Sequence, residues 1–172
     1  MTLGDVWGAA RRRRPPAHLE DGFTILELMV VILIIAILIA IAIPTFLGAR
    51  QKAQDRAAQS NLRNALTAAK TAYVDSQSYQ SDVASGVYAS IEPSLTFVSG
   101  TSTGQGQISV ASSAADQIYL AAKSASGQCF FIQDDTGSTG ATPAGTTYAK
   151  QSASTGCDAH TPPAAANFSN AW

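Results

Sequence analysis

Residues 22–28 read Gly-Phe-Thr-Ile-Leu-Glu-Leu, and the apolar run that begins there continues to Leu47. Glu27 is the one carboxylate in this run. A charged side chain at the centre of a bilayer costs roughly 2.5–3.5 kcal/mol and is a functional candidate by default. We therefore expect Glu27 to pair with a cation.

The apolar run from Phe23 to Leu47 has 25 residues. As a helix that rises 1.5 Å per residue it would be about 37 Å long, enough to cross a hydrocarbon core of roughly 30 Å with some tilt. The run is too long for the apolar part of an ordinary secretory signal, and no small-x-small cleavage site follows it. Gly22 instead offers a cleavage site in front of the run, where a cut would keep the apolar segment.

Residues 1–22 form a polar, basic leader that contains the run Arg11–Arg14. Under the positive-inside rule, this run predicts a cytoplasmic amino terminus. Arg50, Lys52 and Arg56 follow the apolar run on its other side and weaken the charge asymmetry.

Helical signals continue beyond the apolar run. Pro44 lacks an N–H and crowds the carbonyl of Ala40, so it should kink or loosen the helix there. Apolar residues then recur at spacings of three and four, which predicts an amphipathic helix over residues 48–76 with a narrow apolar stripe. One helix over about residues 23–76 is far longer than the usual ~11–12 residues. It must therefore be a membrane span, a filament core, or both.

The composition after residue 76 is rich in Ser, Thr, Ala and Gly, which is typical of exported protein. Short apolar runs between turn residues indicate strands at residues 95–98, 107–111, 117–122, 128–133 and 146–150. Residues 124–127 have the composition of a hairpin loop. We expect an α+β fold in which an antiparallel sheet of about four strands, within a head of residues 77–172, packs on the second half of the helix. The tail from Pro162 to Trp172 is expected to be loose.

Cys129 and Cys157 are the two cysteines of the chain. A single pair fits one disulfide in an oxidising compartment; two unpaired thiols or a metal site short of ligands are the alternatives. His160 alone cannot complete a tetrahedral metal site with them. A disulfide would tie a C-terminal loop back to the sheet.

The sequence argues against several classes of function. A net charge of −1 gives no electrostatic case for a nucleic-acid partner. No nucleophile–base set, phosphate loop or metal spacing is visible, since the two histidines are His18 in the leader and His160 in a Pro-rich tail. We expect no enzyme, catalytic residue, cofactor or metal. Asp134, Asp135 and Asp158 could bind calcium, but we interpret them as carboxylates of a solvated turn.

The motif around Gly22, together with the Ala-Ile-Ala-Ile-Pro of residues 40–44, resembles the class III signal and N-terminal helix of type IV pilins. The resemblance covers residues 22–75 closely. The head resembles theirs only in its layout of strands followed by a late cysteine pair. Secretion and competence pseudopilins share the motif. The resemblance implies the fold of this superfamily, a long helix packed on a small sheet.

The resemblance also implies roles for individual residues. A prepilin peptidase would cut after Gly22 and methylate the new amine of Phe23. Glu27 matches the glutamate that pairs with the Phe amine of a neighbouring subunit. Pro44 matches the proline at which pilin helices unwind on assembly, whereas Ala36 stands where the family often has glycine.

The implied function is that of a structural subunit, a major pilin that polymerises with itself into a surface filament for adhesion or motility. Further implied partners are an inner-membrane assembly platform with its ATPase motor, minor pilins, and the membrane before assembly. The precursor would be a single-pass protein of the plasma membrane, and the assembled form would be extracellular. The alternative is a pseudopilin of a type II-like secretion or DNA-uptake machine, which the Ser- and Thr-rich head fits less well.

Overall fold

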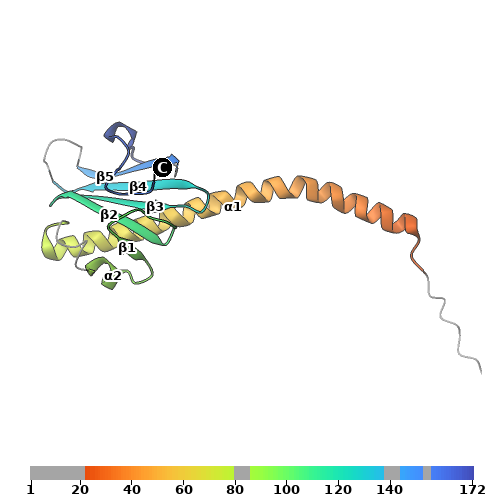
Figure 1. The fold of residues 1–172 in the computed structure, drawn as a ribbon, viewed down its shortest axis with the longest axis horizontal. Coiled ribbons are helices and arrows are strands. Elements are labelled where there is room, and N and C mark those ends of the chain that lie inside the picture. Colours follow the sequence, from red (N-terminus) through yellow and green to blue (C-terminus); the bar gives the residue numbers. More distant parts are fainter. Residues whose placement is uncertain (1–21, 80–85, 138–143, 153–155) are drawn as a thin grey trace, which may run out of the picture. The chain divides into compact units, whose positions relative to one another are not determined.

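The computed structural model describes residues 22–79, 86–137, 144–152 and 156–172 of the chain. Its dominant element is α1 (Ile25–Ser76), a single helix of 52 residues (Figure 1). The expected long helix is thereby confirmed. The leader expected over residues 1–22 lies outside the described residues, except for Gly22.

The chain divides into two compact units, residues 1–42 and 43–172, and α1 contributes to both. Pro44 lies within α1, which continues through it as a helix. A proline inside a helix removes one backbone hydrogen bond and is a common cause of kinks. The boundary between the two units falls two residues before Pro44. The role of Pro44 as a helix breaker during assembly stays a prediction.

The second unit contains a five-stranded sheet in the order β1-β2-β3-β4-β5 (Figure 1). Strands β2 to β5 form the expected antiparallel meander. The elements that follow α1 are α2 (Val87–Ile91), β1 (Thr96–Val98), β2 (Gln107–Ala114), β3 (Gln117–Lys123), β4 (Gln128–Asp135), β5 (Gly145–Ser152) and the 3-10 helix η2 (Ala165–Asn167).

The expectation of about four strands, all antiparallel, was wrong at one edge of the sheet. Strand β1 pairs with β2 in parallel, with Phe97 opposite Ile108. Parallel neighbours need a connection that carries the chain back along the first strand. Because β1 has only three residues, the loop over residues 99–106 is long enough to make that return.

The apolar stripe of α1 packs on one face of the sheet, as expected. Alternate strand residues such as Leu120 and Ile132 point to this face, where they meet Leu62 of the helix in one buried cluster. Burial of a side chain of this size contributes about 1.5–3 kcal/mol. Small residues of the stripe are buried in the same cluster. They are Ala58, Ala65, Ala69 and Ala72.

The C-terminal segment up to Phe168 covers the opposite face of the sheet. The disulfide between Cys129 of β4 and Cys157 is present, with the two Cα atoms 5.5 Å apart. Phe168 packs edge-on against Tyr119, with ring centroids 6.3 Å apart. A second buried cluster, which includes Phe131 and both cysteines, fills this side.

The tail is not loose, which corrects the expectation for residues 162–172. Ser169 exchanges two backbone hydrogen bonds with Tyr148 of the edge strand β5, at N–O distances of 2.8 and 2.9 Å. Trp172 then packs against Phe130 and Tyr148, with ring centroids 5.1 and 5.0 Å away. Aromatic contacts of this kind, together with strand pairing, hold a tail whose composition alone resembles a linker.

The indole of Trp172 provides a test of this packing. Its Nε1 is buried and has no hydrogen-bond partner among the described residues. An unpaired buried donor costs about 1–3 kcal/mol. Trp172→Phe should therefore change the free energy of unfolding by less than about 1 kcal/mol, because the lost ring area is offset by removal of the unpaired donor.

Trp172→Ala removes the ring contacts as well, and should lower the free energy of unfolding by about 2–3 kcal/mol. Guanidinium unfolding of the full chain in detergent measures both variants. If Phe destabilises as much as Ala, ring packing is not what holds the tail.

Candidate functional site

The first candidate site is the start of α1. Gly22, Phe23 and Thr24 precede the helix, which begins at Ile25. The backbone N–H of Glu27 donates to Thr24 Oγ1 at 3.1 Å, and the backbone N–H of Thr24 donates to Glu27 Oε2 at 3.0 Å. This reciprocal pair is a capping box, in which the first residue and the fourth satisfy each other's amides.

A third hydrogen bond completes the arrangement. The hydroxyl of Thr24 donates to the same Oε2 at 2.9 Å. All three hydrogen bonds therefore involve either Oε2 of Glu27 or Oγ1 of Thr24. The other oxygen, Oε1, has no hydrogen-bond partner within the described ranges. A negative charge in the first turn is also favoured by the helix dipole. The box therefore holds the carboxylate in place and leaves one of its oxygens open.

Sequence reasoning singled out Glu27 and missed Thr24. The signal was present, because Thr-Ile-Leu-Glu over residues 24–27 matches the S/T-x-x-E pattern of a capping box before an apolar run. Gly22, Phe23 and Glu27 lie close together simply because they are neighbours in sequence. The structure contains no second copy of the chain, so the pairing of Glu27 with a neighbour's Phe23 stays a prediction.

The apolar half of α1 is exposed along its whole length. Phe23 is 90% exposed, and the large apolar residues from Ile25 to Leu47 are exposed as well. This is a helix long and apolar enough to cross a membrane, and none of its most apolar window is buried. Apolar patches of this extent mark surfaces that contact membrane or protein.

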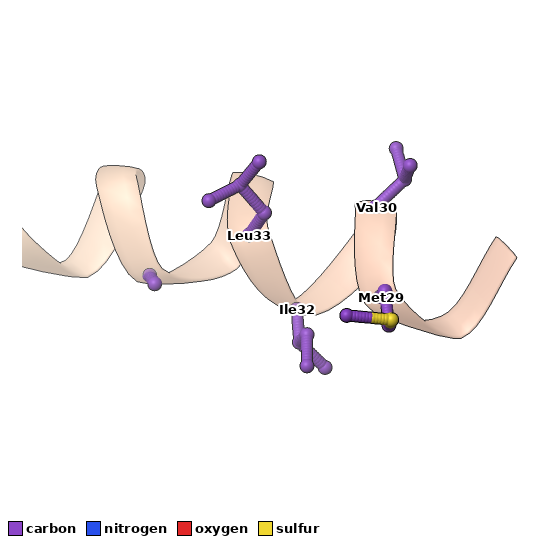
Figure 2. A pocket seen from close by; sticks show the side chains of 5 residues that line it. Met29, Val30, Ile32 and Leu33 are labelled. Atoms are coloured by element: carbon purple, nitrogen blue, oxygen red, sulfur yellow. The ribbon is translucent and has the colours of Figure 1, made fainter. Parts of the chain in front are cut away.

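Grooves between side chains run along this half of the helix. Figure 2 shows one of them, where Val30 and Leu33 project from one side of the ribbon and Ile32 from the other. A second groove is bordered by Phe23, Leu26, Glu27, Val30 and Val31. Ridges of a like helix fit grooves of this kind. Glu27 is thus positioned at the edge of a surface suited to a second helix.

The capping box gives a direct prediction for helix fraying. Thr24→Val removes the hydroxyl, and loss of an N-cap side chain costs about 1 kcal/mol. The Glu27 amide should then exchange its hydrogen about fivefold faster in the full chain in micelles, measured by NMR. Thr24→Ser keeps the hydroxyl and is the matched control. Equal exchange rates in the Ser and Val variants would contradict the capping role.

The second cluster of polar side chains lies inside the head. Asp134 of β4 is only 1% exposed. Its Oδ2 accepts a hydrogen bond from Tyr79 Oη at 2.8 Å, and its Oδ1 lies 2.8 Å from Lys70 Nζ and 2.5 Å from Thr146 Oγ1. Burial, and then the hydrogen bond to Asp134, raise the pKa of Tyr79. The cluster joins α1, the residues just after it, β4 and β5.

The interpretation of the acidic residues as carboxylates of a solvated turn was wrong for two of them. Asp134 and Asp135 are the last residues of β4 and are both buried. Gly137 N donates to Asp135 Oδ1 at 3.0 Å. The apolar run before them extends the strand further than the turn composition suggested.

Asp158 does lie in a turn. Its Oδ1 accepts a hydrogen bond from the backbone N–H of His160 at 2.9 Å and lies 3.1 Å from His160 Nδ1. The backbone bond from His160 is the main reason why the pKa of Asp158 is lowered. Within the described part of the chain, no group of three or more His, Cys, Asp or Glu side chains is placed to hold a metal ion.

Lys70 is the residue through which this buried cluster can be tested. Lys70→Met would leave the buried Asp134 carboxylate without its cation. Breaking a buried ion pair costs about 3–5 kcal/mol; because Lys70 is 48% exposed, we expect about 1–3 kcal/mol. Urea unfolding of the full chain in detergent measures this loss.

Lys52→Met is the matched control, since Lys52 is exposed on the same helix and makes no ion pair among the described residues. It should change stability by less than about 0.5 kcal/mol. Equal stability of the two variants would show that the pair with Asp134 contributes nothing.

The site and the fold together define a class of protein. A long helix that is apolar and exposed in its first half, with a capped glutamate in its first turn, packs its second half on a small α+β head. This is a type IV pilin-like fold.

Comparisons with known proteins agree with that class. Residues 18–43 match the family of the prokaryotic N-terminal methylation motif. The chain is 40% identical over 63 residues to the type IV wide pilus major component PilA4 of Thermus thermophilus, covering 37% of this chain and 48% of that protein. It is 38% identical over 58 residues to the type IV major pilin protein PilA of Myxococcus xanthus, covering 34% and 26%.

The chain thus spans less than half the length of the curated relatives it matches. No solved structure matches it. Its N-terminal region is therefore similar to those of type IV pilins, which confirms the resemblance read from the sequence. Both of these relatives are named as major components of pili.

Proposed function

We propose that this chain is a major pilin, which polymerises through the apolar half of α1 into a surface filament. The observation that carries the proposal is the start of α1. One oxygen of Glu27 is held by Thr24 and the other is open, on the half of α1 whose large apolar residues are all exposed. A lone carboxylate in apolar surroundings requires a cation.

Cleavage after Gly22 would supply that cation. Gly22 and Phe23 lie outside the helix, in the kind of segment that a peptidase can bind as an open chain. The cut converts the Phe23 amide into an amine, which is protonated at neutral pH. Methylation of that amine, as the motif implies, would keep the positive charge.

The ion pair would then form between two subunits. The amine of one subunit would bind Glu27 of its neighbour through the open Oε1, while Thr24 keeps the carboxylate oriented. Apolar contacts alone specify the axial register between two helices weakly, whereas one buried polar pair specifies it strongly. The pair would therefore set the axial step between subunits, and the apolar grooves would supply the contact area.

This function assigns a role to each part of the chain. Residues 1–22 are a cytoplasmic leader removed by the prepilin peptidase, and residues 23–47 span the membrane before assembly and form the filament core afterwards. Residues 48–76 carry the head of residues 77–172, which faces outward. An assembly platform, an ATPase motor and minor pilins would take part in polymerisation. Pro44 would let the helix unwind as subunits pack.

A pseudopilin of a secretion or DNA-uptake machine is the alternative. Both similar proteins are named as major components of pili, which favours the pilin. The aligned stretches of 63 and 58 residues cover little more than the length of one long helix. The assignment to a long surface filament therefore calls for a test on cells.

The test compares Glu27→Ala with Asp75→Asn, which removes one exposed carboxylate from the far end of the same helix. Filaments are sheared from cells and quantified, and the N-terminal residue and mass of the chain are determined in the sheared and membrane fractions. Glu27→Ala should insert into the membrane normally and reduce the filament yield at least about tenfold, because it leaves the amine unpaired. Asp75→Asn should assemble normally.

The chain from wild-type filaments should begin at a methylated Phe23. Mature chain that stays in the envelope and never enters the sheared fraction would instead favour the pseudopilin. A wild-type yield from Glu27→Ala would refute the ion pair. Chain that still carries Arg11–Arg14 would refute cleavage at Gly22.

A further inference from the structure

Three cations follow the apolar run, and the proposed function does not use them. Arg50, Lys52 and Arg56 are exposed. The ion pairs found among the described residues are Lys70–Asp134 and His160–Asp158, so none of the three cations has a carboxylate partner there. In the proposed topology they lie on the extracytoplasmic side, where the positive-inside rule predicts few cations close to a span. They are therefore available to an anionic partner.

One of these cations borders a cavity between α1 and the β3–β4 turn. Leu47, Arg50, Gln51 and Gln54 of α1 line a space of roughly 250 Å³ together with Ala125 and Ser126 of the β3–β4 turn. The cavity thus presents a guanidinium and two carboxamides, with one apolar side chain at its end. This is a set of hydrogen-bond donors suited to an oxyanion.

The walls of the cavity are fixed by Asp55. Its Oδ1 accepts a hydrogen bond from Ser124 Oγ at 2.7 Å and another from Ser126 Oγ. These bonds join α1 to the β3–β4 turn, where Gly127 adopts a positive φ of 87°. Arg50 makes no ion pair with Asp55 or with any other carboxylate among the described residues.

The position of the cavity along α1 indicates where that anion comes from. Arg50 follows Leu47, the last residue of the apolar run, by three residues, which in a helix is about 4.5 Å. The headgroup region of a membrane is roughly 5–8 Å thick on each side. The cavity is also smaller than the ~300–1,000 Å³ of sites for whole small molecules. It is therefore suited to a headgroup whose acyl chains remain in the bilayer.

We propose that this cavity binds the phosphate of an anionic phospholipid while the subunit waits in the membrane, an inference that rests on the proposed pilin topology. Arg50 pairs with the phosphate, Gln51 and Gln54 donate hydrogen bonds to it, and Leu47 lies against the glycerol end of the chains. Lys52 and Arg56 add attraction to a negatively charged lipid surface. The lipid must leave when the subunit enters a filament.

The test uses the full-length chain in detergent, titrated with dioleoyl phosphatidylglycerol or dioleoyl phosphatidylcholine and observed by native mass spectrometry. We expect phosphatidylglycerol to bind at least about tenfold more tightly than phosphatidylcholine, and Arg50→Gln to lose about tenfold in affinity, as for one charge-assisted hydrogen bond. Gln54→Leu should also weaken binding. Arg63→Gln is the matched control, because Arg63 is exposed on α1 and does not line the cavity.

Several results would overturn the proposal. Equal affinity for the two lipids, or equal loss in Arg63→Gln and Arg50→Gln, would leave only general charge attraction. Displacement of the lipid by millimolar inorganic phosphate would make the cavity a site for a free anion. A lower filament yield with unchanged lipid binding in Arg50→Gln would assign the cavity to a contact between subunits.

Failure of the lipid site and failure of the pilin function give different results. The N-terminal residue and the filament yield are determined for the same variants. Processed chain in normal filaments, without lipid selectivity, refutes the lipid site alone. Lipid selectivity in a chain that is neither processed nor assembled refutes the pilin function and leaves the site intact.

Discussion

The structure depends on one helix that must satisfy two different surroundings. The first half of α1 exposes its large apolar residues on all sides, whereas the second half buries a single stripe against the sheet. No other element of the described chain covers the first half. It is therefore stable only in lipid or among like helices. Glu27 is the one charge in that half. Its capping box with Thr24 satisfies backbone amides at the helix N-terminus and leaves Oε1 of the carboxylate without a hydrogen-bond partner among the described residues.

The second half of α1 is fixed to the head by polar bonds at intervals along its length. Asp55 holds the β3–β4 turn, Asn61 Nδ2 donates to the carbonyl of Gln105 at 2.9 Å, and Lys70 reaches Asp134. The alanines of α1 between these points are buried against the sheet, but they specify the axial position of the helix only weakly. The polar bonds can therefore set the axial position of the helix on the sheet, because a shift by one turn would break all three.

Much of this could be predicted from the sequence, and the limits are physical. Helical periodicity and length predicted α1, because this pattern is local in sequence. The cysteine pair predicted the disulfide, because two cysteines allow only one pairing. The parallel pairing of β1 depends on a loop that composition does not describe. Asp134 looked like a turn residue because its partners, Lys70, Tyr79 and Thr146, are distant in sequence. Trp172 belonged to a tail of low complexity, and only its packing on Phe130 reveals its role.

The closed edge of the sheet has a consequence for a crowded assembly. An open edge strand is a template on which any neighbouring chain can add a strand. Here Ser169 occupies the middle of the free edge of β5, and β1 at the other edge has only three residues. If heads lie side by side at high density in the proposed filament, they would thus be poor at fusing their sheets. The surface of each head could then change in sequence without altering the proposed association of the helices.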